Sequence, residues 1–212
     1  HELTHGVVAG SSGLRYEFQS GALNESFSDF FGSMIDGDDW DMGEDLLSPS
    51  GKPTRNMAVP ADSLTAQPSH YSEYQSLSKS NDNGGVHIYS GIPNRALYLL
   101  AEGLSEENLG VSIGRGKTAN LAFLTMTGLT PSASFDEAAE YMASIARIEY
   151  ASEPEIYDAT VLAWRSVGLP QTTITTSSVL NSTVSSQDIT AVAHLKPYYS
   201  TSSYAPEDNY YS

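Results

Sequence analysis

Residues 21–35 read GALNESFSDFFGSMI, and this stretch decides the fold. Its large apolar side chains recur at spacings of three and four along the segment: Leu23, Phe27, Phe30, Phe31 and Met34. That spacing places them on one face of a helix, which predicts an amphipathic helix over residues 22–35. Ser20 or Gly21 is the expected start, because small polar residues and glycine suit the N-cap position.

The segment directly upstream, HELTHGVVAG at residues 1–10, predicts a shorter helix that ends at Gly10 or at the Ser-Ser-Gly that follows. His1 and His5 are four residues apart, so both imidazoles leave the same face of this helix. Two neutral imidazole nitrogens suit Zn²⁺. Glu2 lies beside His1, where it can reach a water at the metal without binding the metal itself.

Two histidines leave a zinc ion short of protein ligands, so a third is required. Glu25 on the next helix is the best candidate. Asp29 follows at i+4 on the same face, where it can accept the second N–H of a ligating histidine and fix its tautomer. HELTH alone arises readily by chance, and the acidic pair is what favours the zinc interpretation.

The remainder of the chain predicts a mainly α fold without internal repeats. Further helices are expected over residues 93–100, 117–126, 134–149 and 152–167, the last two opened by capping boxes at Ser134 and Ser152. Residues 36–74, rich in Asp, Ser, Pro and Gly, predict a long ordered loop. We therefore expect a helical catalytic domain over residues 1–170. Residues 171–212, rich in Ser, Thr and Tyr, predict either a linker or propeptide remnant, or one or two strands.

Composition excludes several function classes. The chain has 212 residues and carries 26 acidic against 10 basic residues, a net charge of −16, which argues against nucleic-acid binding. It has no cysteine, so disulfides and thiolate chemistry are excluded. No run of eighteen apolar residues is present, and no membrane partner is expected.

A cluster of carboxylates follows the second predicted helix. It consists of Asp36, Asp39, Asp41, Glu44 and Asp45. Carboxylates at this density repel one another unless a cation lies among them, and Ca²⁺ takes six to eight oxygen ligands. The cluster predicts a calcium site, with a solvated acidic loop as the alternative.

Four separated motifs, in order, carry a family resemblance: HELTH, GALNESFSD, DWDMGED and NGGVHIYSG. Over residues 1 to about 170 the chain resembles the C-terminal catalytic domain of the thermolysin family of metallopeptidases. The resemblance implies zinc bound by His1, His5 and Glu25, with Glu2 as general base and Asp29 as partner of a zinc histidine. It also implies calcium in the acidic loop, and we expect one ion there.

The resemblance implies roles for residues further along the chain. Tyr16 and His87 would donate to the oxyanion of the tetrahedral intermediate, and Asp82 would orient His87. Arg55 would hold the peptide carbonyl beyond the scissile bond. Taken singly, these are ordinary packing or surface residues; their order and spacing carry the assignment. The expected pocket walls Met42 and Leu46 suggest a preference for an apolar residue after the cut bond.

In this family an N-terminal, largely β domain forms the other wall of the cleft, and residues 1–212 do not include it. We therefore expect this chain to be the C-terminal piece of a longer precursor. Either a separate N-terminal domain or chain completes the groove, or the chain is inactive alone. The leading hypothesis is a secreted zinc endopeptidase that acts on peptides or proteins. The alternative is a metal-binding domain without turnover.

Overall fold

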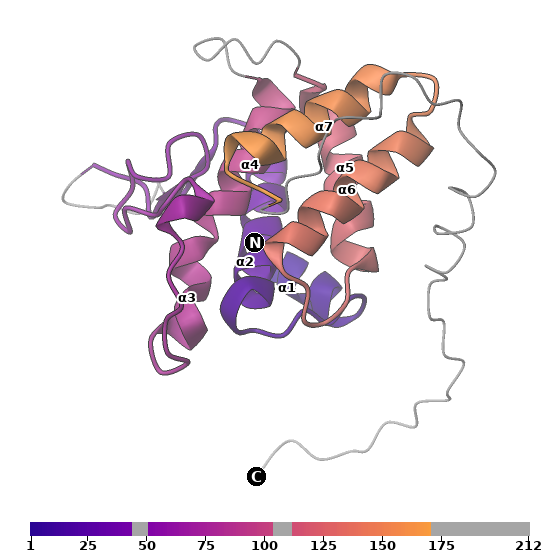
Figure 1. Cartoon of the computed structure of the whole chain (residues 1–212). Helices are drawn as coiled ribbons and strands as arrows, with labels where there is room; N and C mark the ends of the chain where they lie inside the picture. The colour runs from indigo at the N-terminus through magenta and orange to yellow at the C-terminus, as the bar shows by residue number, and fades with distance from the viewer. Residues whose placement is uncertain (44–50, 104–111, 171–212) are drawn as a thin grey trace. The chain divides into compact units, whose positions relative to one another are not determined.

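The computed structural model describes residues 1–43, 51–103 and 112–170, and within these ranges the fold is mainly α, as predicted (Figure 1). Its helices are α1 (Glu2–Ala9), α2 (Phe18–Asp36), α3 (Asp82–Tyr89), α4 (Gly91–Glu102), α5 (Gly114–Gly128), α6 (Phe135–Glu149), α7 (Pro154–Ser166) and the 3₁₀ turn η1 (Tyr71–Glu73). None of these helices is long and apolar enough to cross a membrane. Predictions about Glu44, Asp45, Leu46 and residues 171–212 lie outside the described residues.

Helix α2 lies at the centre of the domain and packs against α1, α3, α4 and α5. Its apolar side chains Phe27 and Phe30 are almost completely buried, as the sequence pattern predicts. Glu25 and Asp29 are equally buried on the same helix. An ionised carboxylate is costly to bury unless it is paired, so these two residues require partners.

The start of α2 differs from the prediction. The helix begins at Phe18, four residues before Ala22, and its N-cap Glu17 makes no side-chain capping bond. Ser20 is inside the helix and donates to the carbonyls of Arg15 and Glu17 at 2.9 Å each. Packing of α2 against its neighbours therefore outweighs the local capping preference of Ser20 or Gly21.

Helices α4 to α7 form the remaining core, with α4 packed on α5, α5 on α6, and α7 on both α6 and α4. The capping box at Ser134 is confirmed, since its side chain and that of Glu137 exchange bonds with each other's backbone N–H. The capping box at Ser152 is wrong. Helix α7 begins at Pro154, whose fixed φ suits the first helical position, and its N-cap Glu153 makes no side-chain capping bond.

The predicted loop after α2 contains a short antiparallel pair, β1 (Asp41–Met42) and β2 (Arg55–Asn56), in which Met42 lies opposite Arg55. Gly37 ends α2 with a φ of 85°, in the left-handed region that glycine adopts without strain. The strand pair lies beside α2. It therefore places Arg55 close to the buried carboxylates of that helix.

Helix α3 was not predicted, and its first turn explains why. Residues 82–85 all have positive φ, between 49° and 89°, so this turn is left-handed. Asp82 Oδ2 then accepts hydrogen bonds from the backbone N–H groups of His87 and Ile88, at 2.8 and 3.2 Å. The left-handed turn thus presents a carboxylate to the start of the right-handed turn that carries His87.

Candidate active site

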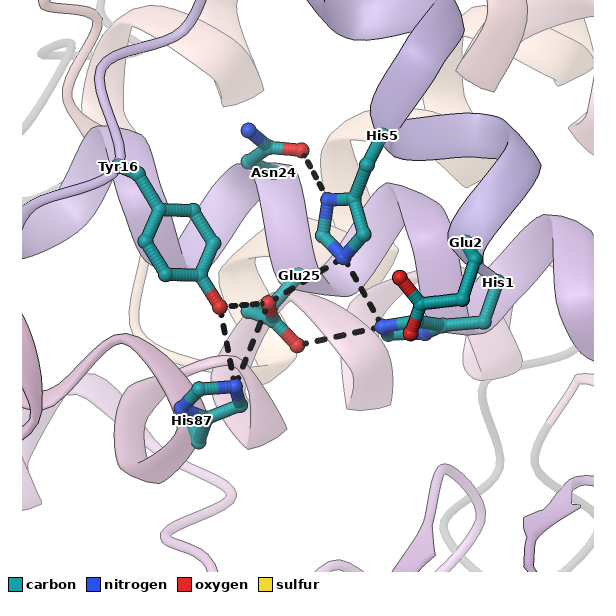
Figure 2. Close-up of a pocket in the computed structure, with 7 residues that line it drawn as sticks. All are labelled: His1, Glu2, His5, Tyr16, Asn24, Glu25 and His87. Carbon is teal, nitrogen blue, oxygen red and sulfur yellow. Dashed lines mark hydrogen bonds and ion pairs between the residues drawn. The ribbon is translucent and has the colours of Figure 1, made fainter. Parts of the chain in front are cut away.

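One pocket of about 340 Å³ brings residues from α1, α2, α3 and the α1–α2 connection together (Figure 2). Its lining consists of His1, Glu2, His5, Tyr16, Asn24, Glu25 and His87. Of the residues predicted at the site, the structure therefore places six around a single opening.

The two histidines of HELTH face each other through their Nε2 atoms, which lie 3.0 Å apart. The Nδ1 atom of His5 lies 2.8 Å from the amide oxygen of Asn24, and that of His1 lies 2.8 Å from Asp29 Oδ1. An amide oxygen only accepts, so His5 Nδ1 is a donor, and the carboxylate of Asp29 beside His1 Nδ1 favours a proton on that nitrogen as well. In the neutral rings, both Nε2 atoms consequently carry lone pairs directed at the same point.

Glu25 supplies the third group at this point. Its carboxylate oxygens lie 3.5 Å from His1 Nε2 and 3.4 Å from His5 Nε2. Oε2 is buried and accepts no hydrogen bond from any described residue. All three ligand atoms lie within 4.8 Å of one another. Oε1 accepts from the Tyr16 hydroxyl, but the lone pairs of Oε2 and of the two Nε2 atoms converge without a donor and repel one another unless a cation binds, so this group fits a metal ion.

Behind these ligands lies a buried ion pair. Arg55 donates from Nε to Asp29 Oδ2 at 2.8 Å and from Nη2 to Oδ1 at 2.7 Å. Burial alone would raise the pKa of Asp29, but the hydrogen bond from His1 and the charge of Arg55 outweigh it and lower that pKa. Arg55 also lies 4.0 Å from Glu25. One guanidinium thus faces two buried carboxylates, which leaves a negative charge for a cation to balance.

The pKa of His1 responds to the same pair. Burial disfavours the charged ring, but the hydrogen bond to Asp29 and the charges of Asp29 and Glu25 raise the pKa of His1 above its ordinary value. A metal ion at the Nε2 lone pair would need the neutral ring. The carboxylate of Asp29 can interact with both the neutral and the protonated ring of His1, because Nδ1 carries a proton in both.

Tyr16 and His87 stand at the opposite side of the pocket, with the tyrosine hydroxyl 3.0 Å from His87 Nε2 (Figure 2). Burial, and then the hydrogen bond that Tyr16 donates to Glu25, raise the pKa of Tyr16 above its usual value, so the phenol remains a donor at neutral pH. His87 Nδ1 lies 2.6 Å from Asp82 Oδ1. That contact turns His87 Nε2 toward the pocket.

Residues 12–169 match the family model described as "Thermolysin metallopeptidase, alpha-helical domain". The chain belongs to the thermolysin family of metallopeptidases. The match begins after HELTH, so it does not depend on the histidine motif.

Two curated relatives and one solved structure illustrate the range of this thermolysin family. Bacillolysin of Brevibacillus brevis is 49% identical over 139 residues, 64% of this chain and 26% of the relative. Neutral protease NprE of Bacillus pumilus is 40% identical over 174 residues, 80% of this chain and 53% of the relative. A protealysin precursor, a metalloproteinase of Serratia proteamaculans, aligns with a TM-score of 0.66 at 32% identity, covering 78% of this chain and 55% of that one. The chain thus spans a quarter to a half of these relatives.

The remaining predicted site residues of this thermolysin-family chain lie apart from the pocket lining. Met42 is half-buried in β1, and its sulfur accepts a hydrogen bond from Ser33. Asp36 and Asp39 are exposed, and Asp39 Oδ1 accepts from the backbone N–H of Asp41 at 2.8 Å. Among the described residues, these carboxylates do not form a convergent metal-ligand group. Calcium binding in this loop remains a prediction.

Sequence reasoning missed three polar residues that support the site. Asn24 orients His5, as described above. Gln67 is buried and donates to the carbonyl of His87 at 2.6 Å. Asn94 is buried and donates to Asp29 Oδ2 at 3.0 Å. Asn24 stands in the quoted GALNESFSD motif, next to Glu25. Gln67 and Asn94 are distant in sequence from the residues they contact, so no local pattern marks them.

Proposed function

We propose that this chain is the catalytic portion of a zinc-dependent endopeptidase. The observation that carries the proposal is the convergence of His1 Nε2, His5 Nε2 and the Glu25 carboxylate, whose buried Oε2 accepts no hydrogen bond from any described residue. These three residues would hold the metal, with Asp29 and Asn24 fixing the imidazole tautomers. When bound, zinc supplies a Lewis acid that lowers the pKa of water and polarises the substrate carbonyl.

The residues of the chain supply the proton transfers. Glu2 lines the pocket beside His1, where its carboxylate can take a proton from the attacking water. The water oxygen bonds to the peptide carbonyl carbon, and the same carboxylate then passes the proton to the leaving nitrogen as the C–N bond breaks. Tyr16 faces this space with an O–H that can donate to the carbonyl oxygen as it gains charge, and His87 can donate from Nε2 when both of its ring nitrogens carry a proton.

Replacement of the base without loss of a ligand tests this assignment. Glu2→Gln should retain stoichiometric zinc but lose peptide cleavage, because the amide cannot accept the proton. Glu140→Gln, an exposed change on α6, is the matched control and should leave cleavage unchanged. Zinc content and hydrolysis of a generic protein substrate are the two measurements. Full cleavage by Glu2→Gln would refute the mechanism.

The second candidate function is a metal-binding domain without turnover. The chain spans only 26% of its Brevibacillus relative and 53% of its Bacillus pumilus relative, so the activity of these longer proteins is not carried over to it without a test. Stoichiometric zinc without chelator-sensitive cleavage by the wild-type chain would favour this candidate. Cleavage that stops when a chelator is added would favour the enzyme.

Three finer features complete the proposal. The acidic loop holds one calcium ion, supported by the density of carboxylates over residues 36–45, and the calcium content of the purified protein measures it. The residue after the cut bond is apolar, a preference that rests on the sequence assignment of Met42 and Leu46 as pocket walls. The protein is secreted, and calcium in the acidic loop would take the stabilising role that disulfides have in other extracellular proteins.

A further inference from the structure

We infer that Asn94 is a positioning residue for the metal site, acting through Asp29 on His1. The inference rests on the proposed zinc binding. Asn94 lies on α4, is completely buried, and donates from Nδ2 to Asp29 Oδ2 at 3.0 Å. It touches neither the pocket nor the proposed ligands directly, so its effect must pass through the Asp29 carboxylate.

The contacts of Asp29 show what Asn94 contributes. Arg55 bonds both carboxylate oxygens, and His1 Nδ1 lies 2.8 Å from Oδ1. Asn94 provides the second donor to Oδ2, so each oxygen faces two nitrogens. With donors on both oxygens, rotation of the carboxylate away from His1 would break a bond on each side. Without Asn94, only Arg55 would hold Oδ2, and Asp29 could turn with the guanidinium.

Stability alone does not explain an asparagine at this position. Its neighbours on the core face of α4 are apolar, including Leu97 and Ala101, which are both 1% exposed. The amide oxygen of Asn94 is buried and has no hydrogen-bond partner within the described residues. A buried polar atom left unpaired costs about 1–3 kcal/mol, and an apolar residue would avoid that cost. The retained amide is therefore best explained by its donor to Asp29.

Two variants of different size separate donor loss from packing loss. Asn94→Leu removes the donor and keeps the volume, whereas Asn94→Ala removes the donor and opens a cavity. Leu97→Ala is the matched control, because it opens a cavity on the same helix without touching Asp29. Zinc affinity of the full chain is measured by competition with a chromophoric chelator, and thermal stability of the metal-free protein is measured beside it.

We expect both Asn94 variants to bind zinc about tenfold more weakly, the lower end of the range for residues that support metal ligands. Leu97→Ala should bind zinc as the wild type does, even where its thermal stability is lowest. Wild-type affinity in either folded Asn94 variant, or affinity that follows thermal stability across all three, would overturn the inference. A wild-type chain that binds no zinc would overturn the proposed function and this inference with it.

Discussion

Gly91, the first residue of α4, lies so close to the preceding loop that no side chain fits. A Cβ built there would meet the carbonyl oxygen of Pro68 at 2.5 Å and Gln67 Cβ at 2.6 Å. In an open helix, Gly→Ala gains up to about 1 kcal/mol of helix propensity. Here the extra methyl must displace backbone, which typically costs about 1–3 kcal/mol and more when the obstacle cannot move. We expect Gly91→Ala to destabilise the protein by about 2 kcal/mol, a fall in Tm of about 4–8 °C.

The matched control is Gly116→Ala in α5, where nothing lies within 4 Å of the added carbon. It should raise Tm by about 1–4 °C, so the two substitutions should have opposite signs in one thermal-melting assay. Displacement of Gln67 should also loosen His87, because Gln67 donates a hydrogen bond to the His87 carbonyl. The Gly91→Ala variant should therefore cleave substrate more slowly than the wild type even at temperatures well below its Tm. If both variants gained stability, the close approach between Gly91 and Pro68 would be refuted.

Two further predictions concern a helix cap and a buried charge. Ser134→Ala should cost about 1 kcal/mol by breaking the capping box of α6, measured by denaturant unfolding, whereas Ser152→Ala, outside any cap, should change stability by less than about half of that. Folding lowers the pKa of Asp29. The ionised carboxylate therefore contributes its full stabilisation of the fold above the unfolded pKa near 3.9, and this contribution is lost as pH falls through the folded pKa. Asp29→Asn should therefore destabilise the metal-free protein at pH 7, by about 3–5 kcal/mol, and should flatten the loss of stability below pH 4; an unchanged acid profile would contradict this.

The features that sequence predicted well are those with a local physical cause. Spacing of Leu23, Phe27 and Phe30 reflects one buried helix face, and the capping box at Ser134 joins residues three positions apart. The convergence of His1, His5 and Glu25 was also predictable. Four-residue spacing aligns the two imidazoles on one helix, and only the approach of α1 to α2 had to be assumed.

Features with a non-local cause were predicted poorly or not at all. Ser20 satisfies the rules for a helix start, yet α2 begins before it, and packing buries Ser20 and Gly21 inside the helix. The left-handed turn at residues 82–85 contains a pair of glycines, and such pairs also occur in ordinary loops, so the sequence does not distinguish this turn from a loop. Asn94 is 65 residues from Asp29, and nothing near it in the sequence distinguishes it from an ordinary helix residue.

The position of the site on α2 makes its charge balance depend on how the other elements dock on that helix. Because Glu25 and Asp29 lie on the innermost helix, neither can relax toward water, and each must be satisfied by groups brought from elsewhere in the chain. Arg55 comes from β2, Asn94 from α4 and the imidazoles from α1, so the full set of partners exists only when these elements are docked on α2. One guanidinium cannot balance both carboxylates, so the folded chain keeps a negative charge beside the imidazoles that favours a bound cation. Metal affinity and folding should therefore be coupled, because the same docked helices create both the ligand geometry and the charge that a cation satisfies.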